Sequence, residues 1–541
     1  MKKFFFLLST IYYLLSTSSP AYAASEFTTS FNSLYTIESS GETNVTHTIT
    51  LKNNLAHIYA TNYSIATSGD QLNNIQTRDE FGSIANTTTT QNGVTTIHLS
   101  IDRPAIGKDQ QKTLTLSYQT TDVVESIGDT LTLNIPRLSR ANEAGEYTRV
   151  VKIEGIQDRP QFIYPPPSKT EPDGDFTTYT FSGHQGDSLT LLFGSSVTYR
   201  LDLTYELKNK ELGSVETELA LPPDTAYQRV LLSSIDPDPS SIRVDSSGNW
   251  LAKYSLKSQE KLIVKAELYA TIYPQPTLFD PSTNNFQKTT NSKYWDTNSR
   301  TVVDLAARLQ TPQNIYNYLT SNYTYNYAGI KNGAKRLGAL ASLTSSTSVL
   351  CTEFTDSFVS LARVQNITSR EINGFGYTKN STLQPQNISS DILHAWPEYY
   401  DSSKKTWISV DPTWGNTTGG IDYFHNLEFS HIAFVRHGEE DSYPLPAGAY
   451  KSNPSDKHII VEIASTIPPE IIQTETKNNR LYNTGNVAIR DETLGYIPPY
   501  GSADLVPTQQ LSFYAKIKSL CAKLFSKFLR RQPVSTLPNT F

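Results

Sequence analysis

The sequence predicts a multidomain protein in which β-sandwich domains precede an α+β core and a small C-terminal β domain. Its 541 residues are too many for one ordinary domain. Short runs that alternate apolar and polar residues, typical of half-buried strands, recur over about the first 270 residues. A helical spacing of apolar residues begins only near residue 300, so the pattern changes there from all-β to mixed.

Residues 1–23 have the features of a secretory signal peptide. Lys2 and Lys3 give a positive start, residues 4–15 are apolar, and Ala21-Tyr22-Ala23 is a small-residue cleavage site. An uncleaved N-terminal anchor is the alternative, although the apolar run is short for a membrane span. We therefore expect an exported protein that is extracellular or associated with the cell envelope.

The composition favours a globular exported protein held together by packing. Its hydrophobic fraction is 37% and its formal net charge is −6, which gives no general reason to bind nucleic acid. Two cysteines cannot build a disulfide framework. The sequence has no calcium-loop or zinc-ligand spacing, so we expect no metal and no cofactor.

Two β domains are predicted, over residues 24–158 and 159–282. The first contains "THTITLKN", "TTIHLSID" and "KTLTLSYQT", which read as strands of an antiparallel sandwich. The Pro-rich stretch "DRPQFIYPPPSKTEPDGD" cannot continue a strand ladder and is interpreted as the boundary. The second domain repeats the style with "TTYTFSG" and "KLIVKAELYATIY".

The α+β core is predicted over residues 283–442. The stretch "RTVVDLAARLQTPQNIYNYLTSNY" has helical spacing, and Pro312 should divide it into two helices. The β-like runs "KHIIVEIAST" and "NVAIRDETLGYIPPYGS" then predict a small β domain over residues 443–508. Residues 509–541 form a tail of different chemistry.

Cys351 is a candidate nucleophile because the pattern around it predicts the start of a helix. Ser348 is a plausible N-cap ahead of it. Unpaired N–H groups and the positive end of the helix dipole favour a thiolate there, and the same groups could bind an oxyanion. The alternative is an inert buried thiol, a common state of free cysteine. The residues that follow form one apolar helical stripe: Phe354, Phe358, Leu361 and Ala362.

The stretch "ILHAWPEYYDSSKKTWISVDPTW" predicts a β-hairpin with its turn at residues 401–405. If Tyr400 pairs with Trp407, then His394 and Asp411 are diagonal neighbours on one face. A carboxylate there can accept a hydrogen bond from one imidazole nitrogen and orient the other toward a thiol. A slip of one residue would separate them. The alternatives are a surface histidine and an aspartate that starts a turn.

The region from about residue 295 to 415 resembles the transglutaminase-like superfamily, whose core shares the papain-like arrangement. The resemblance is carried by "CTEF" at a helix start, "LARVQNITSREINGFGY", "HAWPEYY" and "WISVDPTWG". It implies a catalytic triad of Cys351, His394 and Asp411. The sequence departs from the family at residues 367–370, "ITSR" in place of the usual Ile-Pro-Ala-Arg, and at Val349, where a small residue is usual.

The resemblance implies a thiol acyl-transfer enzyme that acts on amide bonds of protein or peptide substrates, of the transglutaminase or cysteine peptidase type. A thioester would be resolved by an amine or by water, and the triad does not distinguish the two. The alternative is a non-catalytic cell-surface adhesion or scaffold protein with a degenerate transglutaminase-like module. Three histidines that fit no metal motif are interpreted as structural or exposed: His425, His431 and His437.

Residues 511–531, "LSFYAKIKSLCAKLFSKFLRR", predict a basic amphipathic helix, with Cys521 in its apolar stripe. Such a helix can lie in an anionic membrane interface. The alternatives are docking on protein through the same stripe, and disorder.

We predict that a peptide of residues 511–531 becomes helical on anionic vesicles, binds neutral vesicles much less, and loses affinity as salt rises, because salt screens charge attraction. Replacing both Leu520 and Leu524 with Ser should remove binding even at low salt. Circular dichroism with vesicle sedimentation measures both effects. Equal binding to neutral and anionic vesicles, or no helix on either, would favour docking on protein.

Overall fold

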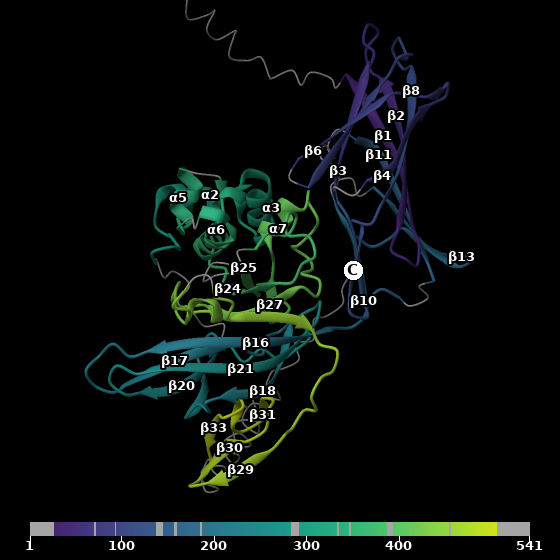
Figure 1. The fold of residues 1–541 in the computed structure, drawn as a ribbon. Helices are drawn as coiled ribbons and strands as arrows, with labels where there is room; N and C mark the ends of the chain where they lie inside the picture. Colours follow the sequence, from purple (N-terminus) through teal and green to yellow (C-terminus); the bar gives the residue numbers. More distant parts are fainter. Residues whose placement is uncertain are drawn as a thin grey trace, which may run out of the picture.

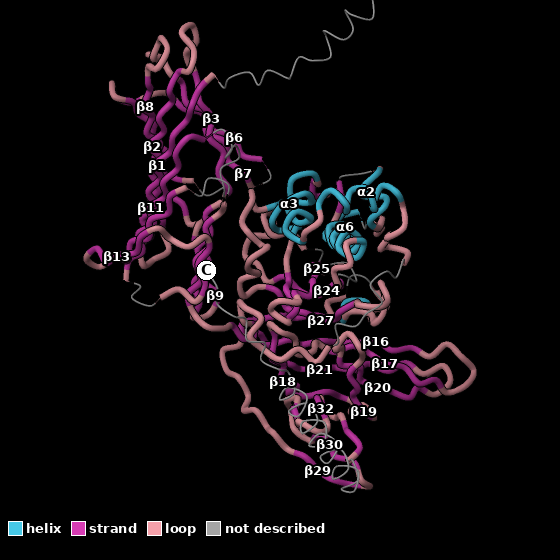
Figure 2. The backbone as a smooth tube through the Cα atoms, turned by 180° about the vertical axis from the view of Figure 1, so that it is seen from behind, coloured by secondary structure: helices cyan, strands magenta, loops and turns pink. Residues whose placement is uncertain are grey.

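The computed structural model describes residues 26–505, apart from residues 70–71, 92, 137–143, 156–158, 184–186, 283–291, 333–334, 346–347, 387–392 and 454–455. The predicted signal peptide and the basic tail with Cys521 lie outside this range. One β-sandwich stands beside a helix-containing core and a second lies beneath it (Figures 1 and 2). None of the helices in the described ranges combines the length and apolarity that crossing a membrane requires.

The first β-sandwich surrounds one apolar core with three sheets. Their strand orders are β13-β14-β11-β1-β2-β8-β4-β5, β12-β15-β10-β9 and β3-β7-β6. Strand β2 alternates buried and half-buried residues along its whole length, as its sequence pattern predicts. The strands are β1 (Phe27–Ile37), β2 (Thr43–Asn53), β3 (Asn62–Ser68), β4 (Asn73–Asp79), β5 (Gly82–Ser83), β6 (Asn86–Gln91), β7 (Val94–Ser100), β8 (Gln111–Thr120), β9 (Val124–Ile127), β10 (Thr130–Ile135), β11 (Ala144–Glu154), β12 (Phe162–Tyr164), β13 (Lys169–Asp173), β14 (Phe176–Ser182) and β15 (Leu189–Phe193).

The boundary between the two sandwiches lies after β15 and not at residue 158. Strands β13 and β14 extend the large sheet through the pairing of β14 with β11. Strands β12 and β15 pair with each other, and β15 pairs with β10. The Pro-rich stretch therefore connects strands of one sandwich. It is tolerated because Pro172 lies on the edge strand β13, where a missing N–H breaks no ladder.

The second β-sandwich consists of the sheets β18-β21-β16-β28 and β17-β20-β19. Strand β28 (Ile459–Ile463) follows the core in sequence and pairs with β16, with Ile463 opposite Tyr199 and Ile459 opposite Leu203. The core is thus inserted in sequence between two strands of one sheet. The first strand of the domain predicted at 443–508 belongs to this second sandwich. The other strands are β16 (Val197–Lys208), β17 (Val215–Leu221), β18 (Gln228–Asp236), β19 (Ser241–Val244), β20 (Trp250–Leu256) and β21 (Lys261–Ile272).

The α+β core places its helices over the four-stranded antiparallel sheet β26-β25-β24-β27 (Figure 1). Pro312 begins α3 and Thr311 caps it, so the proline divides the helical stretch as predicted. Every residue of α6 from 351 to 363 is buried, which makes α6 the central helix. The elements are α2 (Arg300–Leu309), α3 (Pro312–Asn322), β22 (Thr324–Tyr325), α4 (Tyr327–Asn332), α5 (Ala339–Thr344), β23 (Ser348–Val349), α6 (Cys351–Val364), β24 (Ser369–Gly376), β25 (His394–Asp401), β26 (Thr406–Ser409), α7 (Pro412–Thr417) and β27 (His431–His437).

A small β unit follows β28 and rests on the second sandwich, where Val487 forms a bridge with Leu231. The predicted order of β-sandwiches, α+β core and small C-terminal β unit is confirmed. The short helix η2 (Ala447–Ala449) precedes β28, and the elements after it are β29 (Thr474–Lys477), β30 (Arg480–Asn483), β31 (Ile489–Asp491), β32 (Gly495–Ile497) and β33 (Ser502–Asp504).

A buried ion network fixes the core on the second sandwich. Arg436 Nη1 on β27 donates to both oxygens of Asp280, at 2.8 and 2.9 Å. Arg370 Nη2 on β24 lies 3.0 Å from the same carboxylate, and Arg370 Nε donates to Glu398 at 2.7 Å. Burial raises the pKa of Asp280, but the two guanidinium groups outweigh it and hold the pKa well below its usual value. Asp280 therefore joins the sandwich to two strands of the core.

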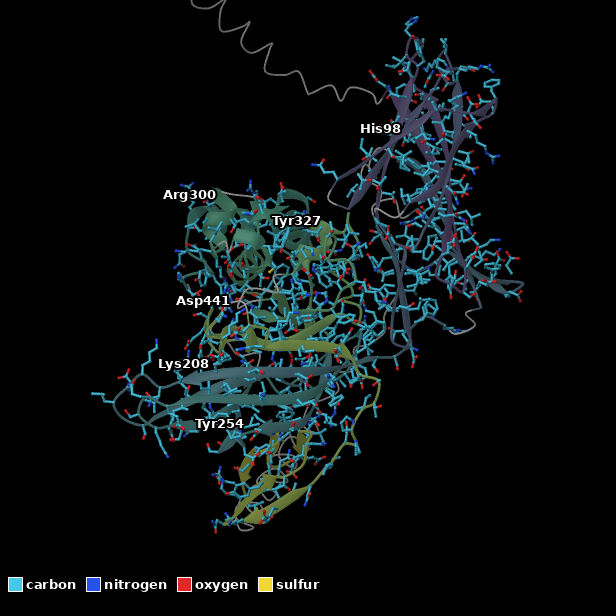
Figure 3. All side chains as sticks on the ribbon, viewed as in Figure 1. His98, Lys208, Tyr254, Arg300, Tyr327 and Asp441 are labelled. Atoms are coloured by element: carbon cyan, nitrogen blue, oxygen red, sulfur yellow. The ribbon has the colours of Figure 1, made fainter. Side chains whose placement is uncertain are left out.

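We predict that Asp280→Ala lowers the free energy of unfolding by about 3–5 kcal/mol, because it leaves two buried guanidinium groups without their carboxylate. The control is Asp304→Ala, whose partner Arg300 lies on the outer side of the helical layer (Figure 3) and whose exposed pair is worth no more than about 1 kcal/mol. Denaturant titration measures both.

The folded-state pKa of Asp280 is depressed, so its contribution is complete above the unfolded value of about 3.9 and is lost as pH falls below it. The stability difference between wild type and Asp280→Ala should therefore shrink in acid. Similar losses for the two variants at neutral pH would contradict this role.

Candidate active site

Cys351 is the first residue of α6 and is 4% exposed. The N-cap is Leu350, not Ser348, which lies on the short strand β23. Glu353 closes the helix start instead: its carboxylate accepts from the backbone N–H of Leu350 at 2.9 Å and of Leu337 at 2.8 Å. The thiol therefore sits where the unpaired N–H groups of a helix favour negative charge.

His394, the first residue of β25, lies between Cys351 and Asp411. Its Nε2 donates to Asp411 Oδ2 at 2.9 Å, and both side chains are fully buried. Its Nδ1 has no hydrogen-bond partner among the described residues, which leaves it available to the Cys351 thiol, one of the groups that raise the pKa of the ring. Burial lowers the pKa of the ring, but Asp411 and then the thiol outweigh it and raise the pKa to about 9. Trp414 stacks on the ring with centroids 5.0 Å apart.

Asp411 comes from a helix start and not from the return strand that the sequence predicts. Tyr400 does pair with Trp407, but β26 ends at Ser409 and Asp411 is the N-cap of α7. Its Oδ1 accepts from the backbone N–H groups of residues 413 and 414, at 2.8 and 3.1 Å. Burial raises the pKa of Asp411, but hydrogen bonds and charge from two histidines outweigh it and hold the pKa well below its usual value.

The second of these histidines is His431, which the sequence interpretation left as structural or exposed. It opens β27, is 6% exposed, and its Nε2 lies 3.2 Å from Asp411 Oδ2. The spacing of His425, His431 and His437 hid this role, because only the position of β27 beside β24 brings His431 to the carboxylate. His425 instead contacts Asp422, and His437 donates toward the carbonyl of Pro444.

The two imidazoles and the carboxylate also form a possible metal-ligand set. Their ligand atoms lie within 4.8 Å of one another, and nitrogen and oxygen donors of this kind suit zinc. The hydrogen bonds already account for these three side chains without an ion. A second such group, Glu206, Asp456 and His458, lies at the surface of the second sandwich.

A buried arginine, which sequence reasoning missed, ties α6 to the sheet. Arg336 Nε donates to Asp356 on α6 at 2.9 Å, and its Nη2 donates to Glu371 on β24 at 2.6 Å. Trp295 Nε1 also donates to Asp356, at 3.1 Å. These bonds fix the helix that carries Cys351 relative to the sheet that carries His394.

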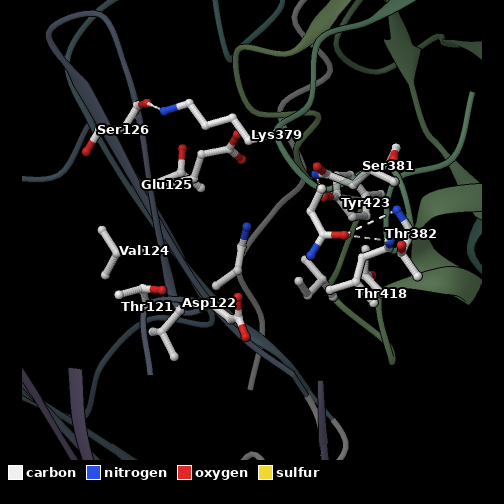
Figure 4. Close-up of a pocket in the computed structure, with 17 residues that line it drawn as sticks. Thr121, Asp122, Val124, Glu125, Ser126, Lys379, Ser381, Thr382, Thr418 and Tyr423 are labelled. Atoms are coloured by element: carbon white, nitrogen blue, oxygen red, sulfur yellow. Dashed lines mark hydrogen bonds between the residues drawn. The ribbon is translucent and has the colours of Figure 1, made fainter. Parts of the chain in front are cut away.

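A cavity of about 560 Å³ lies between the first sandwich and the core (Figure 4). Residues 121–126 line it on the sandwich side, and residues 379–384 line it on the core side. At its edge, Lys379 Nζ donates to the carbonyl of Ser126 at 2.6 Å. Burial raises the pKa of Glu125 in this wall, and its Oε1 has no hydrogen-bond partner.

The core wall of this cavity contacts the site at two places. Tyr423 lines the cavity, and its carbonyl accepts from the backbone N–H of Asp411 at 2.9 Å. Thr382 also lines it, and its carbonyl accepts from the Tyr327 hydroxyl at 2.9 Å, on the side of the core that faces the first sandwich (Figure 3). Tyr327 packs against Tyr325, whose pKa is raised by burial and then by Cys351.

A cysteine at a helix start, a strand histidine and a carboxylate beside it, on an α+β core, are the features of a papain-like site. Residues 296–412 match the family described as the transglutaminase-like superfamily. The core of this chain is therefore a transglutaminase-like domain, as the resemblance predicts.

Solved structures similar to this chain include a candidate cysteine protease from Cytophaga hutchinsonii, at 14% identity, 51% of this chain, 92% of that chain and a TM-score of 0.34. The periplasmic domain of TgpA from Pseudomonas aeruginosa, bound to ethylmercury, has 15% identity, 41% and 91% coverage and a TM-score of 0.23. An M1 zinc metallopeptidase mutant from Deinococcus radiodurans has 11% identity, 35% and 46% coverage and a TM-score of 0.23. Such low scores carry no argument about function. A comparison with curated proteins finds no match.

Proposed function

We propose that this protein is an exported thiol acyl-transfer enzyme that acts on amide bonds of protein or peptide substrates, of the transglutaminase or cysteine peptidase type. One observation carries the proposal: the imidazole of His394 bonds to Asp411 through Nε2, which leaves its other nitrogen for the Cys351 thiol, a group at a helix start that raises the pKa of the ring. Export to the cell envelope or beyond is proposed from residues 1–23.

Acylation would begin with proton transfer from Cys351 to His394 Nδ1, which forms a thiolate and an imidazolium. The thiolate attacks the amide carbonyl carbon, and the backbone N–H groups at the start of α6 stabilise the oxyanion. The imidazolium then gives its proton to the leaving amine as the C–N bond breaks. The products are a free amine and a thioester on Cys351.

Deacylation would use the same histidine as a base. Neutral His394 takes a proton from the attacking amine or water as it adds to the thioester carbonyl. The C–S bond then breaks as the new amide or acid forms, and the imidazolium returns the proton to the Cys351 sulfur. An amine such as a lysine gives an isopeptide crosslink, and water gives hydrolysis. Asp411 remains ionised throughout, because its pKa is held low, and it stabilises the imidazolium.

The cavity between the first sandwich and the core is the proposed approach for a polypeptide substrate. Its core wall contacts Asp411 on one side and the Tyr325–Tyr327 pair beside Cys351 on the other. Its volume of about 560 Å³ is large enough to take side chains of a polypeptide. The first sandwich would then supply one wall of the substrate site.

We predict that His394→Ala abolishes incorporation of a labelled primary amine into envelope proteins, whereas Asp411→Asn leaves residual activity. The histidine moves the proton, while the aspartate only orients and stabilises it. Cys351→Ala is the inactive control. Release of new N-termini without amine incorporation would assign the peptidase type. Equal, small effects of the two substitutions would contradict the assigned roles.

The same variants can be compared without a substrate, by using mass spectrometry to follow the alkylation of Cys351 by iodoacetamide. Because the pKa of His394 is raised to about 9, its ring should stay protonated below that pH and be able to stabilise a thiolate beside it. A protonated imidazole and a helix start both favour the reactive thiolate, so we expect measurable alkylation of Cys351 at about pH 6. A wild-type thiol that reacts only above about pH 8 would instead favour a non-catalytic adhesion or scaffold protein.

We predict that Thr121→Trp, which places a bulky side chain at the exposed sandwich wall of the cavity, reduces amine incorporation into proteins and leaves Cys351 alkylation unchanged. A polypeptide must pass the cavity, but iodoacetamide is small. The matched control is Thr88→Trp, at an exposed position on β6 outside the cavity lining. If both variants incorporate the amine into proteins as fast as the wild type does, protein substrates do not reach Cys351 through this cavity.

A further inference from the structure

The carboxylate of Asp411 is held by four hydrogen bonds, and one comes from a residue outside the proposed triad. Its Oδ1 accepts the two N–H groups of α7, and its Oδ2 accepts from His394 and from His431. A carboxylate offers about four lone-pair sites, so this group is saturated. It cannot turn in its pocket without losing a buried bond, which is costly.

The ring of His431 is itself fixed with Nε2 toward Asp411. Its Nδ1 lies 3.2 Å from the Leu427 carbonyl and 3.3 Å from the Ser430 hydroxyl. Whichever of these Nδ1 bonds, Nε2 must carry a proton, because its partner, the Asp411 carboxylate, can only accept. Burial lowers the pKa of His431, which favours this neutral donor form. The ring packs at 4.5 Å from Trp414 and edge-on at 4.9 Å from Trp396. His431 therefore presents one N–H to one carboxylate oxygen.

We infer that His431 is a positioning residue of the acyl-transfer site, which locks the Asp411 carboxylate so that His394 keeps its Nδ1 toward Cys351. This inference rests on the proposed function. His431 touches neither the thiol nor the substrate in the proposed reaction, so it would act only through Asp411. Its hydrogen bond also helps to keep that carboxylate ionised in acid, because it stabilises the charged form.

The charged groups around His431 are few among the described residues. Asp411 and His394 face its Nε2. Glu398 and Glu428 line a cavity of about 20 Å³ beside its ring. Within the described part of the chain, neither glutamate hydrogen-bonds to His431: Glu398 is held by Arg370 and Ser409, and Glu428 accepts from Asn134. Removing the His431 imidazole should therefore change the reactivity of the Cys351 thiol mainly through Asp411.

The test is the pH profile of Cys351 alkylation by iodoacetamide in the full-length protein, for wild type, His431→Phe and His431→Gln. Phenylalanine keeps an aromatic ring between the tryptophans but has no donor, whereas glutamine can place an amide N–H near the position of Nε2. We expect His431→Phe to slow alkylation at about pH 6 by about 10-fold or more, since small displacements of reacting groups have effects of this size. The pH at which the alkylation rate falls in acid (the acid limb of the profile) should also move higher. Asp411 would lose one of the hydrogen bonds that stabilise its charged form, and so would support the His394 imidazolium less well in acid.

We expect His431→Gln to restore the position of the acid limb and most of the rate. His437→Phe is the matched control: His437 is buried on the same strand, but it lies near Glu371 and Pro444 and not Asp411. It should change the thermal midpoint without moving the limb. An unshifted limb and rate in His431→Phe would overturn the inference, as would equal shifts in His431→Phe and His431→Gln. A wild type that shows only ordinary thiol reactivity would instead overturn the proposed function.

Discussion

The candidate site depends on one carboxylate that does two structural tasks at once. Asp411 caps α7 through Oδ1, and it holds two imidazoles through Oδ2. Capping fixes the carboxylate to the backbone, so its direction is set by the start of a helix and not by a flexible side chain. The position of His394, and hence of the nitrogen that faces Cys351, follows from this bond. The stacked ring of Trp414, the third residue of the same helix, limits movement of the imidazole further.

The two halves of the site lie on separate layers that buried charges hold in register. Cys351 is on a helix and His394 on the sheet below it, and Arg336 links the two through Asp356 and Glu371. The sheet is linked in turn to the second sandwich through Asp280. Breaking any one of these pairs would leave an uncompensated charge in the interior, so the layers have little freedom to slide.

Local patterns predict the parts of the site that are close in sequence. The spacing of the hairpin predicts that His394 and Asp411 meet, although Asp411 reaches His394 from the start of α7 and not from the hairpin. The apolar stripe after Cys351 correctly places it at a helix start. The same patterns predict the wrong N-cap, because Ser348 is paired in the short strand β23 and Glu353 accepts from the backbone N–H of Leu350 instead. They also could not find His431 or Arg336, whose partners lie 20 or more positions away, on other elements. An alternation of apolar and polar residues predicts a strand but not which distant strand it pairs with. The pattern therefore predicts a domain boundary at the Pro-rich stretch, where the structure instead pairs β14 with β11.

The return of β28 to the second sandwich has a consequence for how the chain is made. Until residue 459 is available, β16 presents a bare row of N–H and C=O groups along one side, between residues 199 and 203. Such an open edge is a template for strand pairing between molecules. A chain that stops within the core would leave this edge uncovered, whereas the complete chain closes it with its own strand. Once residues 459–463 pair, the edge of the sheet is the five-residue β28 and no longer the twelve-residue β16, and a shorter edge strand is a poorer template.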